Sequence, residues 1–354
     1  MSPASVRRWP AEWEPHAATW LGWPHHEPDW PGKFGAVPWA FAEIVRVLHR
    51  YERVELVCDS EEVRADAVGH LSAHGVDLGR CGLHVVPTDR VWLRDSAPTG
   101  VHGPRGFEWI RWAFNAWAKY GNYRKDELVS GAVADLSGQP AVLALRPDGA
   151  GRLVLEGGGI EGNGAGALLV TEEWLLSDLQ IRNPGLGAAD YERAFAEYLG
   201  ATDTIWLGEG VVGDDTHGHV DDVARFTDTN TVVVTVEPDP ADENHRRMAD
   251  NLRRLELARV AGGLRVVTLP FPAPVIMEGE RLPASYANFY VANGVVIVPT
   301  FNDKNDRLAL GILADLFPGR DVVGIHAVDL VWGLGSLHCL TQQQPAPGRT
   351  GATG

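Results

Sequence analysis

The sequence predicts an α/β protein in which one unit, a hairpin of two strands followed by a helix, recurs along the chain. Short apolar runs rich in β-branched residues are too short for helices, so they indicate strands. Turns of Gly, Asn and Asp separate these runs in pairs, which is typical of hairpins. The predicted hairpins pair residues 155–160 with 167–171, 223–226 with 231–235, and 288–291 with 295–300. The predicted helices span residues 191–199, 245–258 and 307–317.

Polar segments of the kind found in active sites recur at a similar interval. They lie around Asp95, Glu156, His219, Asn288 and Cys339, at separations of 61, 63, 69 and 51 residues. Five units of this size could close into a ring with the polar segments at its centre. An ordinary mixed α/β sheet with regularly spaced hairpins would show the same spacing, so both arrangements stay open at this point.

Composition limits the classes of protein that the chain could belong to. With 45% hydrophobic residues and no linker-like stretch, residues 1–345 are expected to form a single domain, followed by a disordered tail at 346–354. The 31 basic and 47 acidic residues give a net charge of −16, which disfavours nucleic acid as a partner. No apolar run approaches the roughly 20 residues that a membrane span needs. A cytoplasmic location is therefore expected.

Three cysteines are present, and only one has a context that suggests chemistry. An odd number without paired spacing predicts neither a disulfide framework nor a zinc site built from cysteine pairs. Cys58 ends an apolar strand-like run, and Cys58 and Cys81 are interpreted as core residues. Cys339 follows a glycine-containing turn and His338, and it precedes a block of glutamines. A thiolate is a strong nucleophile, so Cys339 is the candidate nucleophile.

A second polar stretch, residues 213–222, carries two histidines among four aspartates. His219 and Asp221 are two residues apart, so on a strand both would point to the same face. A histidine beside a carboxylate suits general acid and base catalysis near neutral pH. The set of His217, His219 and Asp221 would equally suit a metal ion, and a structural turn is a third interpretation.

A third stretch, residues 89–98, supplies a second candidate carboxylate. If it forms a strand, Trp92 and Arg94 share one face and Asp95 lies on the other. An Arg–Asp neighbour pair is commonly an ion pair that only stabilises the fold. Asp95 and Asp221 together could instead grip the planar fork of a guanidinium group.

Thirteen tryptophans are a high number for a chain of 354 residues, and several flank the polar stretches. Those near the polar stretches are Trp20, Trp23, Trp92, Trp112 and Trp117. Most of these rings are expected in the core, although indole faces also attract cations and line narrow pockets.

These stretches together resemble the agmatine deiminase family, in the peptidyl-arginine deiminase branch of the guanidino-modifying superfamily. The matching segments run in family order and are residues 10–13, 21–24, 89–98, 114–117, 156–158, 182–184, 215–221, 281–290 and 338–345. The resemblance implies a fivefold pseudosymmetric α/β propeller of the pentein type, which is the ring alternative above. It also implies a homodimer.

The resemblance implies a role for each site residue and a reaction that needs no metal and no cofactor. Cys339 corresponds to the nucleophile, His219 to the general acid and base, and Asp95 and Asp221 to the guanidinium clamps. Glu156 corresponds to a supporting carboxylate of the substrate site. The expected reaction is hydrolysis of agmatine to N-carbamoylputrescine and ammonia, through a covalent amidino-cysteine.

The substrate is less firmly implied than the reaction. Asp215 and Trp92 are candidates for binding the distal amine of agmatine, and Trp117 is a candidate for the wall of the pocket. Free arginine, peptidyl arginine or another alkylguanidine is the first alternative, and the carboxylate of an arginine-type substrate would need a cation. The candidate cations are Arg94, Arg182 and Arg281. A metal-dependent amidohydrolase and an inactive guanidine-binding protein are the remaining alternatives.

The chain departs from the family pattern at three places. The family usually has Asp or Asn at His217 and Gly at Ala118, and it has more glycine in the turn at 334–336. All three departures are expected to reshape the mouth of the pocket.

Overall fold

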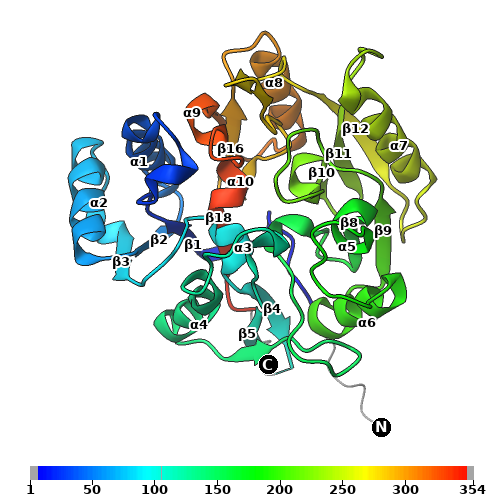
Figure 1. Cartoon of the computed structure of the whole chain (residues 1–354), viewed down its shortest axis with the longest axis horizontal. Coiled ribbons are helices and arrows are strands. Elements are labelled where there is room, and N and C mark those ends of the chain that lie inside the picture. The colour runs from blue at the N-terminus through cyan, green and yellow to red at the C-terminus, as the bar shows by residue number, and fades with distance from the viewer. Residues whose placement is uncertain (1–6, 105, 349–354) are drawn as a thin grey trace.

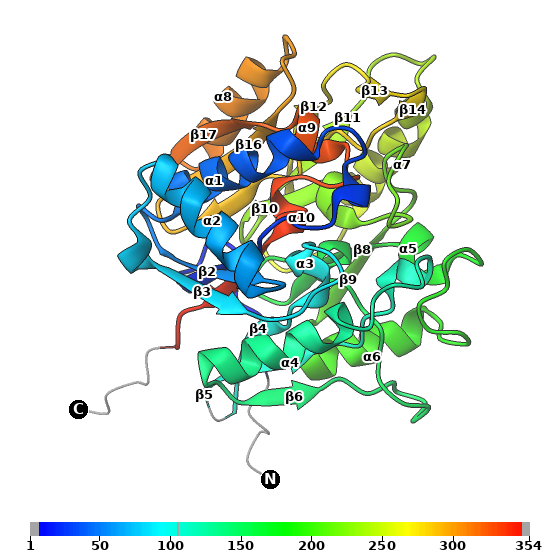
Figure 2. The same cartoon turned by 60° about the vertical axis from the view of Figure 1, so that its left-hand side comes forward.

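The computed structural model describes residues 7–104 and 106–348, in which small mixed sheets and their helices are arranged around a common centre (Figures 1 and 2). In this part of the chain, five sheets repeat one pattern. An antiparallel pair is followed by a helix, and a further strand then joins the second strand in parallel. Parallel neighbours need such a crossover, which explains why each hairpin is followed by a helix.

Four of these sheets have three strands each, and a helix precedes each third strand. The strands are β4 (Thr99–Gly103), β5 (Gly106–Arg111) and β6 (Ala141–Leu143); β7 (Glu161–Gly162), β8 (Ala167–Thr171) and β9 (Asp203–Leu207); β10 (Ala224–Asp228), β11 (Thr231–Val236) and β12 (Arg265–Pro270); and β15 (Tyr290–Ala292), β16 (Val295–Thr300) and β17 (Asp321–His326). The helices are α4 (Asp126–Ser137), α6 (Ala188–Leu199), α7 (Glu243–Leu257) and α8 (Asp306–Leu316). The hairpins predicted at 223–235 and 288–300 and all three predicted helices are confirmed. The first predicted hairpin is displaced, because its first strand is β7 and residues 157–159 form a 3-10 turn instead of a strand.

The fifth sheet joins the two ends of the described chain. Its order is β18 (Thr341–Pro345), β1 (His16–Gly22), β2 (Arg53–Cys58) and β3 (Cys81–Val85), with α1 (Val37–Leu48) and α2 (Glu61–Ala73) as crossovers. β18 and β1 are antiparallel, with Thr19 opposite Gln343. The N–H of Ala346 donates to the Pro15 carbonyl at 2.7 Å, and residues 349–354 of the expected tail lie outside the described residues.

Short elements complete the described chain. They are α3 (Leu93–Ser96), α5 (Glu172–Leu176), α9 (Val328–Val331), α10 (Leu337–Leu340), and the strands β13 (Ile276–Met277) and β14 (Glu280–Arg281). No helix in residues 7–104 or 106–348 is both long and apolar enough to cross a membrane.

The polar segments at the centre are short helical turns, so the prediction of strands there was wrong. Asp95 lies in α3, and Asp221 lies in the 3-10 turn Val220–Asp222 that follows His219. In α3 the N–H groups of Asp95 and Ser96 both donate to the Trp92 carbonyl, and the Ser96 hydroxyl does so too. Short polar side chains favour such local bonds over a strand ladder.

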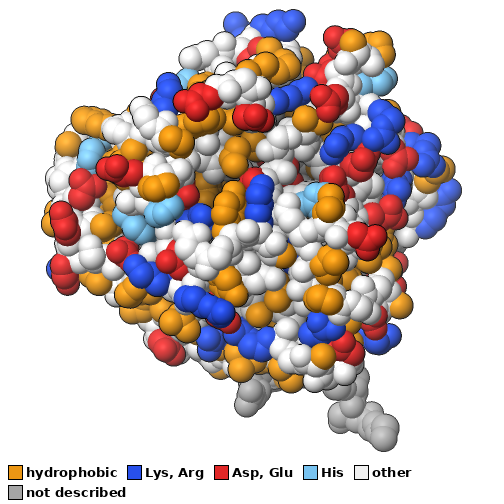
Figure 3. Space-filling view, viewed as in Figure 1, with side chains coloured by type: hydrophobic (Ala, Val, Ile, Leu, Met, Phe, Trp, Pro, Cys, Tyr) orange, Lys and Arg blue, Asp and Glu red, His pale blue; other side chains and the backbone are white. Residues whose placement is uncertain are grey.

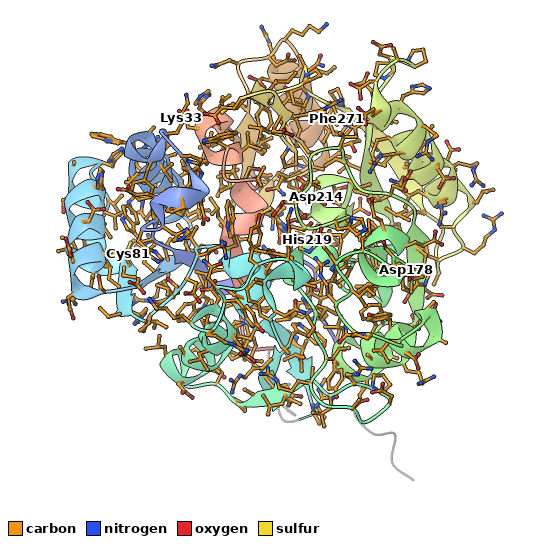
Figure 4. The ribbon with its side chains drawn as sticks, viewed as in Figure 1. Lys33, Cys81, Asp178, Asp214, His219 and Phe271 are labelled. Carbon is orange, nitrogen blue, oxygen red and sulfur yellow. The ribbon has the colours of Figure 1, made fainter. Side chains whose placement is uncertain are left out.

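The cores lie between the sheets and their helices. Cys58 and Cys81 are buried in one apolar cluster, as predicted, and Trp20, Trp23 and Trp112 are also buried. Burial raises the pKa of Cys58 to about 12 and that of Cys81 to about 11, so both thiols stay protonated. Cys81 lies far out in the molecule, whereas His219 lies near its centre (Figure 4).

Candidate active site

Cys339 sits in the one-turn helix α10, where one amide side chain holds both the turn and the sulfur. Nδ2 of Asn288 lies 3.1 Å from the Cys339 Sγ. Oδ1 of the same side chain accepts from the Ser336 hydroxyl at 2.8 Å and from the His338 N–H at 3.0 Å. Asn288 is fully buried, so these bonds fix the position of the sulfur at the floor of the site.

His219 lies between two carboxylates. Its Nδ1 is 3.8 Å from Oδ1 of Asp95, and its Nε2 is 3.7 Å from Oε2 of Glu156. Both distances exceed a hydrogen bond, and within residues 7–104 and 106–348 both ring nitrogens are buried without a hydrogen-bond partner. The ring stands edge-on to Trp174, with centroids 5.6 Å apart. His219 therefore presents Nδ1 to Asp95, which lines the pocket, and Nε2 to Glu156.

Gly158 shows how closely the polar groups converge. A Cβ at this position would lie 2.6 Å from Nδ1 of His219, 3.0 Å from Oδ1 of Asp95 and 3.1 Å from Oδ2 of Asp221. Only a residue without a side chain fits here, which explains the glycine in the Glu156-Gly157-Gly158 motif.

The two candidate clamp carboxylates are held differently. Asp95 accepts from the indole N–H of Trp117 at 2.8 Å and from the Gly158 N–H at 2.9 Å. Oδ2 of Asp221 lies 2.8 Å from Nδ1 of His338 and 3.7 Å from the Cys339 Sγ. Oδ1 of Asp221 has no partner in the described part of the chain.

Burial and the neighbouring carboxylates shift the pKa values of Asp95, His219 and Cys339. Burial raises the pKa of Asp95 to about 6, although the charge of His219 opposes this. Burial alone would lower the pKa of His219, but Asp95 and Glu156 raise it to about 9. Burial, followed by Asp221, Asp222 and Asp95, raises the pKa of Cys339 well above its usual value. At neutral pH these shifts favour a protonated thiol and a protonated histidine beside several carboxylates.

Glu156 is completely buried and stays ionised. Burial would raise its pKa, but Arg182, with Nε 3.1 Å from Oε1, acts together with His219 and the Trp174 indole to lower the pKa to about 2. The indole N–H of Trp174 donates to Oε2 at 2.7 Å. Glu156 thus lies behind His219 rather than in the wall of the pocket.

A pocket of about 470 Å³ opens above the sulfur. Its wall includes the predicted residues Trp92, Asp95, Trp117, Asp215 and Cys339. On the face that Figure 3 shows, acidic and basic side chains are interspersed around a central hollow. A cationic ligand that passes this rim meets Asp95 and Cys339 at the bottom.

The rim contains an ion pair that the sequence did not indicate. Asp215 bonds to the ammonium of Lys119 and accepts from the Tyr120 hydroxyl at 2.7 Å. Lys119 and Tyr120 follow Trp117 in the chain, so this contact joins two separate loops at the pocket. A ligand amine near Asp215 would compete with Lys119.

The arginines that were candidates for a substrate carboxylate have other partners. Arg94 donates to Gln343 and to the His338 carbonyl, and Arg182 bonds to Glu156. Arg281 donates to Asp242 at 2.8 Å. Arg90 is the arginine found in the wall of this pocket, where it stacks on Tyr120 with its Cζ 4.4 Å from the ring centroid.

The set of His217, His219 and Asp221 is not brought together. Nε2 of His217 lies 2.9 Å from the Ser177 hydroxyl, and Nδ1 lies 3.9 Å from Glu173, away from the pocket. Within the described ranges, the acidic and thiol groups close enough to share a cation are those of Asp221, Asp222 and Cys339, within 4.8 Å of one another. Burial and Asp221 raise the pKa of Asp222 well above its usual value, which favours its uncharged form and disfavours such binding.

The three departures from the family pattern share one backbone property. Ala118, His217 and Leu334 have φ of 54°, 64° and 69°. These are left-handed conformations, in which Gly, Asn and Asp are favoured. Leu334 and Gly335 line the pocket, so this turn does shape its wall. Ala118 and His217 do not line it.

Asn288, His338 and Glu12 are site residues whose contacts the sequence did not reveal. Each lies in a segment that carried the family resemblance, but no spacing rule connects residue 12 with residue 338. Their contacts depend on the folded chain, which brings Oε2 of Glu12 to 2.8 Å from Nε2 of His338.

Fold and site together define an enzyme of the guanidino-modifying class, a C–N hydrolase with a buried thiol between carboxylates. Residues 8–345 match the model of the Porphyromonas-type peptidyl-arginine deiminase family, and the chain belongs to that family. It is 35% identical to the agmatine deiminase of Pseudomonas aeruginosa, over 96% of each chain.

Solved structures agree with this assignment. The agmatine deiminase of Enterococcus faecalis superposes with a TM-score of 0.86 at 28% identity, over 98% of each chain. The substrate-bound agmatine deiminase of C. jejuni superposes with the same TM-score at 25% identity, also over 98% of each chain.

Proposed function

We propose that this enzyme hydrolyses agmatine to N-carbamoylputrescine and ammonia, with Cys339 as the nucleophile. The observation that carries the proposal is the convergence of four groups, because Asp95 and Cys339 line one pocket and the buried His219 and Asp221 lie directly against them. Nδ1 of His219, Oδ1 of Asp95 and Oδ2 of Asp221 surround the space next to Gly158, and Oδ2 of Asp221 lies 3.7 Å from the Cys339 Sγ. This set matches a planar cation that is attacked at its central carbon.

The first half of the reaction transfers the amidino group to sulfur. Asp95 and Asp221 accept N–H bonds from the guanidinium and aim its carbon at the Cys339 Sγ. The bound cation offsets the carboxylates that raise the pKa of the thiol, so substrate binding promotes the thiolate. Attack forms a C–S bond, and the tetrahedral adduct loses ammonia as His219 donates a proton to the departing nitrogen.

The second half returns the free enzyme. The covalent amidino-thioether leaves His219 neutral, and this ring takes a proton from an incoming water as the water attacks the same carbon. The C–S bond then breaks, which releases the ureido product and the Cys339 thiolate. Glu156 supports both halves through its charge beside Nε2 of His219.

Agmatine is favoured over other guanidines because the similar proteins are agmatine deiminases and because the pocket rim carries Asp215. We assign Asp215 to the distal amine of agmatine, where it would exchange Lys119 for the ligand amine. Trp92 and Trp117 line the alkyl chain. An arginine-type substrate is the second candidate, because Arg90 lies in the wall of the same pocket.

The remaining alternatives have simple tests. A metal-dependent amidohydrolase would lose activity to a chelator and recover it with zinc, and we expect neither effect. An inactive guanidine-binding protein would bind agmatine and release no ammonia.

We also propose an architecture in which residues 1–345 form one domain. The five sheets would be the blades of a fivefold α/β propeller of the pentein type, which their repeated strand order supports. The homodimer, which the family resemblance implies, and the cytoplasmic location expected from the sequence stay predictions. Sedimentation and fractionation of the native host would test them.

The decisive experiment measures ammonia release from agmatine, arginine and an arginyl peptide, with intact-protein mass spectrometry during turnover. Ammonia from agmatine together with a transient amidino adduct on Cys339 is the expected result. Ammonia released only from another guanidine would change the assigned substrate, while the proposed mechanism would stand. No ammonia and no adduct with any of the three would contradict the proposed function.

A further inference from the structure

His338 precedes the nucleophile and bridges two carboxylates. The residue is 1% exposed, with Nδ1 2.8 Å from Oδ2 of Asp221 and Nε2 2.8 Å from Oε2 of Glu12. A neutral imidazole can donate from only one of its nitrogens. If both carboxylates are ionised, both ring nitrogens must carry a proton.

Both carboxylates do favour the ionised form. Burial would raise the pKa of Glu12, but Arg225, His338 and Arg94 hold it well below its usual value. Burial would likewise raise the pKa of Asp221, and the hydrogen bond from His338 lowers it. Two ionised carboxylates thus face the two ring nitrogens, and each can accept a hydrogen bond only from a nitrogen that carries a proton.

Glu12 is itself firmly anchored. Its Oε1 accepts from Nη2 of Arg225 at 2.9 Å and from the Val291 N–H at 2.8 Å. Arg225 is fully buried and also bonds to Glu161. One end of the bridge is thus attached to the backbone of another sheet, which makes it a fixed support for the His338 ring.

The bridge also determines which oxygen of Asp221 is left for a ligand. Oδ2 is used by His338 and lies beside the Cys339 sulfur, whereas Oδ1 is buried with no partner in the described part of the chain. A buried carboxylate oxygen without a donor is costly, so a cationic N–H group is its natural complement. Without the bond to His338 the carboxylate could turn out of its present plane, and neither oxygen would then hold this position.

We propose that His338 is a positioning residue, whose doubly protonated ring is anchored on Glu12 and orients Asp221 so that Oδ1 is presented to a guanidinium. His338 itself does not touch the substrate in this arrangement. The inference rests on the proposed function only in that Asp221 receives the cation.

The first test compares two reagents that alkylate the nucleophile. Rates of Cys339 modification are measured with 2-chloroacetamidine, which is cationic, and with iodoacetamide, which is neutral. The preference is the rate with the cationic reagent divided by the rate with the neutral one. In His338→Gln, which keeps an N–H donor but no charge, this ratio should fall roughly tenfold. His49→Asn is the matched control, since His49 is also buried but bonds to the Val45 carbonyl, and its preference should stay unchanged. Equal slowing with both reagents in His338→Gln would overturn the proposal.

A second test uses the unaltered enzyme, so it stands even if His338→Gln fails to fold. Long-range proton–nitrogen NMR of ¹⁵N-histidine-labelled protein reports whether each ring nitrogen carries a proton. The signal of His338 is assigned by its shift in Glu12→Gln. Two protonated nitrogens at neutral pH are expected, and one bare nitrogen would overturn the proposal. Neither test needs turnover, so an enzyme that ignores agmatine would contradict the proposed function and leave this inference standing.

Discussion

The indole N–H of Trp117 donates to Oδ2 of Asp95 across 2.8 Å. The bond favours the ionised carboxylate and partly offsets the burial that raises the pKa of Asp95 to about 6. Trp117 reaches this position from a left-handed turn in which Ala116, Trp117 and Ala118 all have positive φ. Such a run is strained, and strained backbone is often found at functional sites.

Trp117→Phe should therefore move the acid limb of the kcat/KM profile to higher pH, by about one unit. The ring still fills its space, but the carboxylate loses a donor and holds its proton more tightly. Trp112→Phe is the control, because the Trp112 indole donates to Thr99 instead. An unchanged acid limb in Trp117→Phe would show that Asp95 does not set it.

The unaltered enzyme should show a bell-shaped pH profile. As pH falls through about 6, Asp95 takes up a proton and no longer attracts a cation. As pH rises through about 9, His219 gives up the proton that the leaving ammonia needs. Steady-state kcat/KM for agmatine across this range is the measurement. A profile with a single limb, or with limbs well away from pH 6 and pH 9, would contradict the assignment of the two limbs to Asp95 and His219.

Cys339→Ser should lower kcat by at least about three orders of magnitude while the melting temperature stays close to that of the parent. The change replaces one buried sulfur with oxygen and leaves the turn of α10 intact. Cys58→Ser and Cys81→Ser are matched controls that should retain turnover. If either control loses activity with its stability unchanged, the nucleophile has been misassigned.

Gly158→Ala should reduce kcat about a hundredfold, because the new methyl group would displace His219 or Asp95. Gly69→Ala is the control, since a Cβ there meets nothing within 4 Å in the exposed part of α2. That control should keep full activity and gain about 0.5–1 kcal/mol in free energy of unfolding. Full activity in Gly158→Ala would contradict the crowded geometry of the site.

Asp215→Asn should raise KM for agmatine roughly tenfold with little change in kcat. The same variant should leave KM for butylguanidine, which lacks the distal amine, unchanged. This comparison of substrates separates recognition of the amine from damage to the pocket. Equal effects on both substrates would rule out the assigned contact.

The sequence predicted the repeated unit well because strand periodicity and hairpin turns are local properties. The hairpin at residues 224–236 and the helix that follows it could be placed from neighbours in the chain alone. The central segments were not placed correctly, because local bonds to the Trp92 carbonyl close a turn at Asp95 where a strand was predicted, and distant segments pack against this turn. Gly157 packs against the Arg94 carbonyl, a contact that no local pattern encodes.

For the site, motif resemblance supplied the residue types but not their partners. Glu156 proved to lie behind His219, and Asp215 proved to be paired with Lys119. Three residues in left-handed conformations explain why the family pattern favours Gly, Asn or Asp there. The chain tolerates Ala118, His217 and Leu334 at these points through tertiary packing, which a sequence alone does not display.

Pairing of β18 with β1 has a consequence for how the protein is made. During synthesis on the ribosome, β1 is translated before β18, so one edge of β1 stays uncovered until β18 has also been translated. Cys339 immediately precedes β18, so the sulfur and the partner strand of β1 are made together. A chain cut short before residue 339 would hold the carboxylates and the histidine without the sulfur, so it should release no ammonia.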